Sequence, residues 1–308
     1  SVLNSYALRT DGSPYSGTMF FRGGEFSHGS ATDFSSNFSA EADQQFKLTI
    51  LGSGSTYNTA LQSVGGTFEL LSGNLTFAAD NTYTGSTTVT NGLLTIGNDS
   101  VSDPYGSLNS TAPLVVVSDA EVILKNNIEV GSISGSGTID FGLSPDVYDL
   151  TVGGDNSNTT FSGELQGSGT LVKKGSGTLN LGLTTSSVDL DILNLFQIEA
   201  GTLVLTSPQA KDIRIDGSIT KTTSDPATLQ IEAVNGKDLT IDTSIISTSG
   251  PLDVQAKSDG NIVLDVNESI KTQGGDIVLW SNSGGKQSGS GEHFIRIEAG
   301  SSPNSSGG

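Results

Sequence analysis

A short phrase of small residues recurs along this chain. It consists of Gly-Ser-Gly-Thr followed by alternating apolar residues, and it occurs at 135–139, 167–171 and 175–181, with a shorter form at 201–205. Each copy joins a glycine turn to a short strand. Because a unit of this size cannot bury its apolar side alone, the copies have to stack on one another. The repeat therefore predicts a solenoid of stacked strands.

Pairs of apolar residues at positions i and i+2 give the period in the last third of the chain. One set of pairs begins at 213, 239 and 262, and a second begins at 229, 252 and 277, so the steps lie between 23 and 26 residues. Residues i and i+2 of a strand face the same side, so each pair points inward. We expect an all-β parallel β-helix with coils of about 24 residues and two strands per coil. An antiparallel fold is the competitor, since hairpin signals such as Asn91-Gly92 also occur.

Composition divides the chain into three segments. Residues 1–46 hold half of the 12 Phe and lack the short period, which predicts an irregular N-terminal segment or cap. A sugar-binding aromatic face is the alternative for this segment. Residues 47–300 are expected to form the parallel β-helix. Residues 301–308 are rich in Ser and Gly and are expected to be a flexible tail.

The charge of the chain disfavours two classes of partner. The formal net charge is -19, and no Lys or Arg occurs between Lys47 and Lys125. Such a surface repels nucleic acid and anionic lipid. No apolar stretch is long enough to be a transmembrane helix. We therefore expect neither nucleic-acid partners nor a transmembrane segment in this chain.

The residues that usually carry catalysis or bind metals are sparse. There is no Cys, and the two His, His28 and His293, have no metal ligands at useful spacing. Both are expected to be solvated. Neither a nucleophile elbow nor a phosphate-binding loop occurs. The sequence therefore predicts no cofactor, no metal and no enzymatic activity.

Arg214 and Asp238 are two candidates for surface contact. Asp212 and Asp216 flank Arg214, and Asp238 follows one coil later. A β-helix that cleaves glycans needs clustered carboxylates with a cation nearby, so this cluster keeps an enzyme as an alternative. The favoured interpretation is a stack of surface Asp residues without catalysis.

Trp280 is the third candidate and the only Trp in the chain. If Ile277 and Leu279 point inward, alternation makes Trp280 point outward. An exposed aromatic ring can hold a sugar or a protein partner. The favoured interpretation is that Trp280 packs under the loop 284–291.

Two stretches resemble known repeat families. The Asp-Asn-Thr-Tyr-Thr-Gly motif that opens residues 80–97 resembles the passenger-associated repeat of bacterial autotransporters, as do residues 153–163 and 167–179. Residues 210–300, with their Gly-Gly-Asp-Ile-Val-Leu-Trp-Ser motif, resemble filamentous-haemagglutinin-type adhesin repeats. The resemblance implies a right-handed parallel β-helix on a bacterial surface.

The resemblance and the composition together lead to one expectation. We expect a non-enzymatic structural or adhesive protein at the cell surface or secreted from a bacterium. Its expected partners are a host or neighbouring cell surface, a glycan or a matrix. One alternative is the subunit of an extracellular filament that self-associates end to end. The other is the glycan-cleaving β-helix.

Overall fold

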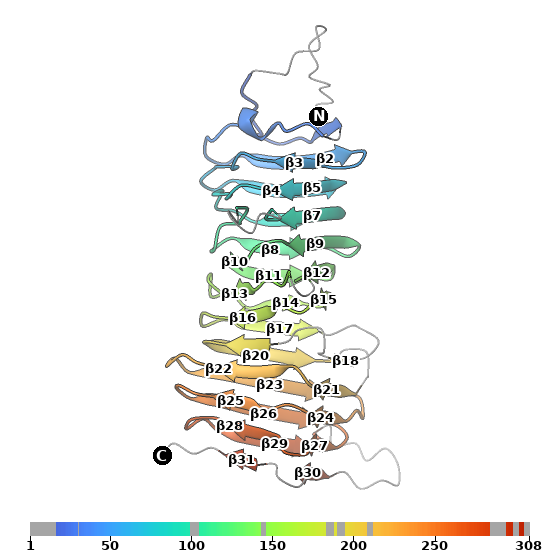
Figure 1. The fold of residues 1–308 in the computed structure, drawn as a ribbon, viewed down its shortest axis with the longest axis vertical. Helices are drawn as coiled ribbons and strands as arrows, with labels where there is room; N and C mark the ends of the chain where they lie inside the picture. Colours follow the sequence, from blue (N-terminus) through green and yellow to red (C-terminus); the bar gives the residue numbers. More distant parts are fainter. Residues whose placement is uncertain are drawn as a thin grey trace. The chain divides into compact units, whose positions relative to one another are not determined.

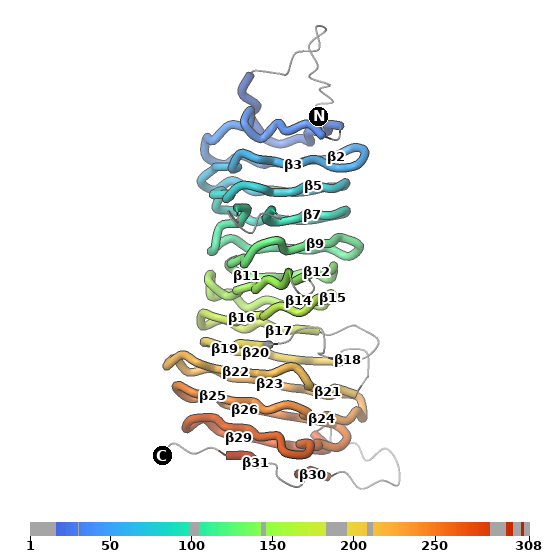
Figure 2. Tube along the Cα trace, viewed as in Figure 1, coloured from blue at the N-terminus to red at the C-terminus, as the bar shows by residue number. Residues whose placement is uncertain are grey.

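The computed structural model describes residues 17–29, 31–98, 105–142, 146–182, 188–189, 195–207, 212–283, 294–297 and 302–304. The chain forms two compact units, Ser1–Leu150 and Thr151–Gly308. Each unit consists of short strands that stack as coils (Figure 1), and Figure 2 traces the chain around the coils of each. Strand β13 (Leu150–Val152) spans the boundary between the units.

The first unit contains two sheets whose strands alternate along the chain. One sheet has the order β1-β2-β4-β6-β8-β11, and the other has the order β12-β9-β7-β5-β3. The first sheet consists of β1 (Phe26–Gly29), β2 (Gln45–Leu51), β4 (Thr67–Ser72), β6 (Thr87–Val89), β8 (Pro113–Val116) and β11 (Ser132–Gly135). The second consists of β3 (Ser55–Tyr57), β5 (Asn74–Phe77), β7 (Gly92–Ile96), β9 (Ala120–Leu124) and β12 (Thr138–Asp140). A short 3-10 helix (Ser35–Asn37) and β10 (Ile128–Val130) complete the unit.

The second unit contains three sheets. One runs β14 (Thr159–Phe161), β17 (Thr178–Gly182), β20 (Gly201–Thr206), β23 (Ala227–Ala233), β26 (Leu252–Ser258) and β29 (Ile277–Ser281). Another runs β16 (Thr170–Lys173), β19 (Leu195–Ile198), β22 (Ser218–Lys221), β25 (Ile245–Ser247), β28 (Ser269–Lys271) and β31 (Ser302–Asn304). The third runs β18 (Val188–Asp189), β21 (Ile213–Ile215), β24 (Leu239–Ile241), β27 (Ile262–Leu264) and β30 (Ile295–Ile297), and β15 (Glu164–Gln166) lies near the start of the unit.

The registers confirm the parallel β-helix that the repeat predicts. Every strand pairing printed by the register of the described residues is parallel, for example β4 with β6 and β26 with β29, so the antiparallel alternative is wrong. In the second unit Ile213 pairs with Leu239, a step of 26 residues, and Leu239 with Ile262, a step of 23. These steps agree with the expected coil of about 24 residues.

The expectation of two strands per coil is wrong for the second unit. Its coils carry a third strand, represented by β22, β25 and β28. The inward residues of these strands begin apolar, as in Ile219, and then turn polar, because Lys221 and Ser247 are buried at 0% and 1% exposure. The polar second position breaks the apolar pair, and the strand is therefore not visible in the hydrophobic pattern.

Inward positions build an apolar core in each unit. Leu48 and Leu70 are paired in register in the first unit, and Leu229 and Val254 in the second, and all four are fully buried. Burying such a side chain contributes about 1.5–3 kcal/mol relative to leaving it in water. Since every coil adds such residues above those of the coil before, stability accumulates coil by coil.

The described part of segment 1–46 packs against the first coils of the first unit. Strand β1 pairs in parallel with β2, and Phe21, Phe26 and Phe46 are buried. The ring centroids of Phe21 and Phe38 lie 4.7 Å apart, and those of Phe21 and Phe46 lie 5.3 Å apart. Offset and edge-to-face contacts at these distances stabilise aromatic clusters. These rings form an interior cluster, so the alternative of an aromatic sugar-binding face is wrong for them.

The expected solvation of His28 is also wrong. Its ring is buried at 6% exposure, and its Nε2 lies 2.7 Å from the hydroxyl of Tyr57. Its Nδ1 lies 2.8 Å from the carbonyl oxygen of Gly29, to which it can donate, leaving Nε2 to accept from Tyr57. The other histidine, His293, lies outside the described residues.

Glycines occupy corners where coils come close together. Gly73 has a φ of 92°, and a Cβ at this position would collide with the carbonyl oxygen of Ile50 on the preceding coil. Only glycine adopts this conformation without strain. The glycine turns of the repeat are therefore explained by coil stacking.

Candidate functional site

A groove crosses the outward surface of three strands in the first unit. Its floor lies on β3, β5 and β7, and its volume is about 580 Å³. The strands put alternate residues inward, so Tyr57, Leu75 and Phe77 are buried while the residues between them face outward. The groove is therefore made from side chains that the core does not use.

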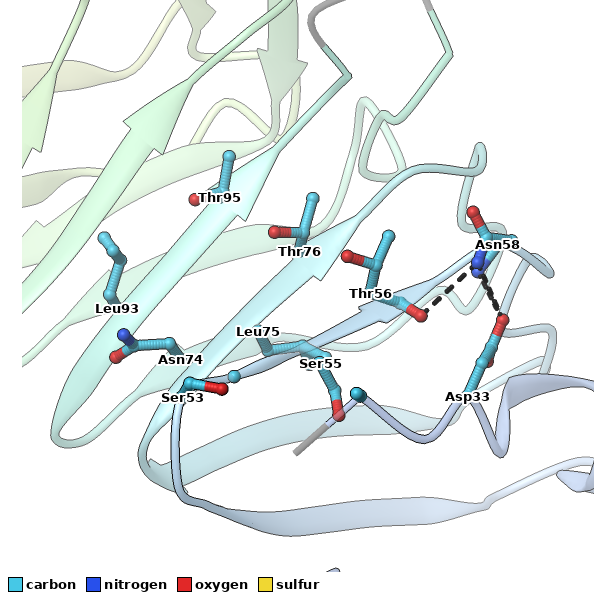
Figure 3. Close-up of a pocket in the computed structure, with 12 residues that line it drawn as sticks. Asp33, Ser53, Ser55, Thr56, Asn58, Asn74, Leu75, Thr76, Leu93 and Thr95 are labelled. Atoms are coloured by element: carbon cyan, nitrogen blue, oxygen red, sulfur yellow. Dashed lines mark hydrogen bonds between the residues drawn. The ribbon is translucent and has the colours of Figure 1, made fainter. Parts of the chain in front are cut away.

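Three threonines form the centre of the floor. Thr56 pairs in register with Thr76, and Thr76 with Thr95, so one threonine stands on each of three successive coils. Neighbouring strands lie ~4.8 Å apart, and the three side chains therefore repeat at that interval. Figure 3 shows their hydroxyls on the same side of the row. Within the described part of the chain, no protein group forms a hydrogen bond with these hydroxyls.

A second row lies beside the threonines, on the side to which their hydroxyls point (Figure 3). Asn74 pairs in register with Leu93, and Ser53 lines the groove next to Asn74. Asn74 is exposed and Leu93 is half-buried. The floor thus combines hydroxyl and amide groups with one apolar surface.

Asp33 and Asn58 form the rim at one end of the threonine row (Figure 3). The carboxylate of Asp33 accepts hydrogen bonds from the backbone N–H of Ser35 at 2.9 Å, and from the backbone N–H and side-chain amide of Asn58 at 2.9 and 3.0 Å. Burial by itself would raise the pKa of Asp33, but the hydrogen bonds from Ser35 and Asn58 hold it below its ordinary value. Both carboxylate oxygens are engaged, and Asp33 therefore fastens the rim as a structural anion.

Arg214, predicted as a contact residue, lies on β21 in the second unit. Its guanidinium forms an ion pair with Asp242, and its Nε lies 3.7 Å from the carboxylate of Asp216. The register of β21 with β24 places Asp216 and Asp242 at equivalent positions of successive coils. The predicted Asp stack therefore exists, and Arg214 bridges two of its members.

Asp238 belongs to a second stack, which joins coils through side chains and backbone. Its own N–H donates to the carboxylate of Asp212 at 3.0 Å, and its Oδ1 accepts from the N–H of Asn261 at 2.7 Å. The Oδ1 of Asn261 in turn accepts from the N–H of Phe294 at 3.1 Å. Since each side chain satisfies a backbone donor on the next coil, Asp238 has a structural role.

Trp280 lies on β29, in a different sheet from Arg214. Its side chain is 53% exposed, which confirms the outward direction expected from alternation. The loop 284–291 that was expected to cover it is masked almost entirely and lies outside the described residues. Val278, two residues earlier, is 43% exposed on the same side of the strand. The structure does not bring Trp280 together with the other two predicted contact residues.

Two buried lysines escaped the sequence analysis. The Nζ of Lys173 donates to the carbonyl oxygens of Lys174, Gly175 and Ala200 at 2.7, 3.0 and 3.3 Å. Lys221 donates in the same way to the carbonyl oxygen of Ser249 at 3.1 Å and to that of Thr223. Burial lowers the pKa of Lys173 to about 8, and it also lowers that of Lys221. Each ammonium satisfies corner carbonyls that would otherwise be buried without donors.

The described residues contain no group of three or more His, Asp or Glu that could hold a metal ion. No helix among them is long and apolar enough to cross a membrane. No protein-family model, curated protein or solved structure matches the chain. The properties of the site therefore have to be argued from the geometry alone.

Proposed function

We propose that this chain is a non-enzymatic structural and adhesive protein that works at a bacterial cell surface or in the medium outside the cell. The observation that carries the proposal is the outward surface of β3, β5 and β7. There, three coils align side chains that neither the core nor the coil-to-coil hydrogen bonds use. A parallel β-helix supplies such a surface at low cost, because its stability resides in the inward residues.

Charge and repeat pattern support the same proposal. The net charge of -19 keeps the chain soluble and disfavours nucleic acid and anionic lipid as partners. The repeats at 80–97 and 167–179 resemble those of autotransporter passengers, which implies an extracellular setting. Arg214 and Asp238 are bound to neighbouring coils, so neither is free to serve as a catalytic group in the described structure.

The test is to display the chain on the surface of a bacterium that does not aggregate by itself. We expect displaying cells to aggregate or to adhere to a surface coated with extracellular matrix, and we expect protease added to intact cells to abolish the effect. The control strain displays an unrelated parallel β-helix of similar size and charge. Equal adhesion by both strains, at equal display, would contradict an adhesive role.

A second candidate is a filament subunit, which the last described strands of the second unit favour. Ile295 and Ile297 pair in register with the buried Ile262 and Leu264, yet they are 43% and 45% exposed. Phe294 beside them is 45% exposed. Within the described residues, no further strand pairs with β29, β30 or β31. Open strand edges and apolar inward residues are what another parallel strand would cover.

Electron microscopy at several protein concentrations tests the filament candidate. We expect filaments whose length grows with concentration, and we expect Ile297→Lys to abolish them by placing a charge where the next subunit would pack. Val266→Lys is the matched control, because Val266 is 51% exposed on an outward corner. Separate particles at all concentrations would exclude the filament.

A further inference from the structure

We infer that the groove over Thr56, Thr76 and Thr95 binds one chain of a neutral polysaccharide, which lies across the strands and contacts all three coils. The inference rests on the proposed adhesive function and names the chemical class of its partner. It is carried by the alignment of the three hydroxyls, the second row beside them and the uncharged lining of the floor.

The groups on the floor match those of a sugar. A hydroxyl donates one hydrogen bond and accepts two, and the amide of Asn74 both donates and accepts. The hydroxyl groups of a neutral sugar have the same mixed character, so either partner can donate. The apolar surface of Leu93, in register with Asn74, faces the same groove and suits the C–H surface of a sugar ring.

The repeat of the floor favours a polymer over a single small ligand. Thr56, Thr76 and Thr95 present the same group three times at intervals of ~4.8 Å. A ligand with a regular series of hydroxyls can meet all three at once, and each additional contact is then intramolecular. The groove is open along this direction in Figure 3, where the row crosses three strands.

Charge favours a neutral partner. The described lining contains no Lys or Arg, and its only carboxylate, Asp33, is engaged by Ser35 and Asn58. The net charge of -19 repels an anionic polysaccharide at long range. A cationic polysaccharide would have no free carboxylate to meet on the floor.

Binding of soluble polysaccharides to the purified full chain tests the inference. The neutral probes are a mixed-linkage β-glucan, a galactomannan and dextran, and the charged probes are alginate and a chitosan oligosaccharide, all measured by calorimetry at physiological salt. We expect at least one neutral probe to bind and the charged probes to bind more weakly. Preferential binding of alginate or chitosan, or no binding of any neutral probe, would overturn the inference.

Variants locate the contact. Replacing Thr56, Thr76 and Thr95 together by Val keeps their shape and β-propensity but removes three hydroxyls. Each neutral hydrogen bond lost weakens binding about 5-fold, so the triple variant should bind on the order of 100-fold more weakly. The triple replacement by Ser keeps the hydroxyls and should retain most of the affinity. Unchanged affinity in the Val variant would overturn the assignment to this groove.

A matched control is available on another surface of the chain. Thr178, Thr202 and Thr228 also stand in register on three successive coils, but no groove residue belongs to them. Their triple replacement by Val should leave glycan binding unchanged. Circular dichroism and thermal unfolding of both triple variants establish that each is folded.

The display strain separates this inference from the proposed function. If cells that display the groove Val variant still adhere, while the purified chain binds no neutral polysaccharide, the groove inference fails and the adhesive function stands. If the purified chain binds a neutral polysaccharide but displaying cells do not adhere, the adhesive function fails. Release of shorter sugars from the bound probe would overturn the non-enzymatic proposal.

Discussion

Lys173 sets two large energetic effects against each other, and its replacement by Met measures which one wins. The side chain is 1% exposed, and its ammonium donates to three backbone carbonyls of the corner. Burial lowers its pKa from 10.5 to about 8, although the nearby Asp155 acts in the opposite direction. That fall corresponds to about 3 kcal/mol against the charged form.

The carbonyls are expected to decide the outcome. Met has a similar length and removes the cost of burying the charge, but it leaves the acceptors at Lys174, Gly175 and Ala200 without this donor. Each buried acceptor left unsatisfied costs about 1–3 kcal/mol. We therefore expect Lys173→Met to reduce the free energy of unfolding by about 3 kcal/mol at pH 7.

The assay is denaturant unfolding followed by circular dichroism, combined with amide hydrogen exchange at 170–205. Local exchange is needed because coils of a solenoid can open in parts. Lys271→Met is the control, since Lys271 is exposed on β28, in the same sheet as Lys173, and should change stability by less than about 0.5 kcal/mol. Equal or greater stability of Lys173→Met would refute the reasoning and show that the burial cost dominates.

The same residue predicts a pH dependence. Between pH 8 and 10.5 the folded state releases the proton of Lys173 while the unfolded state still holds it, so the stability of the wild type rises with pH. The difference in stability between wild type and Lys173→Met should therefore grow by up to about 3 kcal/mol across this range. A constant difference would contradict the lowered pKa.

Three further predictions test the first unit and the coil stacks by thermal and denaturant unfolding. Gly73→Ala should cost more than about 2 kcal/mol because of its positive φ and the collision with the neighbouring coil, while Gly29→Ala, which has open space around it, should be near neutral. Burial lowers the pKa of His28, so the unfolded state takes up the proton first as pH falls below about 6.5, and stability should fall there in the wild type but not in His28→Phe. Asp238→Ala should cost about 1 kcal/mol by removing the acceptor for the N–H of Asn261, whereas Asp238→Asn keeps an acceptor oxygen and should cost less; equal costs would refute the stack.

The sequence predicts the fold well where the inward residues are apolar. Pairs such as Ile213 and Ile215 mark β21 without ambiguity, because both are buried and the residue between them is exposed. The third strand of the second unit is hidden for the opposite reason. There the inward residue next to the corner is Lys221, Ser247 or Thr272, each of which binds corner carbonyls. A polar residue in the core removes the period on which the prediction depends.

The groove could have been found only in part. Thr56, Thr76 and Thr95 each lie between two inward residues, at steps of 20 and 19, so their common row is visible in the sequence once the coil length is known. The first unit, however, uses shorter coils than the 24 residues read from the second. The rim from Asp33 is supplied by a segment without any period, and its contact with Asn58 depends on the folded chain. Register therefore creates the site from residues that are ordinary in isolation.

Partners on neighbouring coils separate structural from functional polar residues on a solenoid. Arg214 and Asp238 attract attention in the sequence because charges are rare there, but both are held by the adjacent coils through Asp242 and Asn261. Thr76 attracts none, yet its outward hydroxyl has no hydrogen-bond partner within the described residues. A coil repeat forces every outward residue to meet an equivalent residue above and below it. Where that meeting satisfies the side chain, the residue stabilises the stack. Where a whole row is left unsatisfied, the row is available for a ligand with the same repeat.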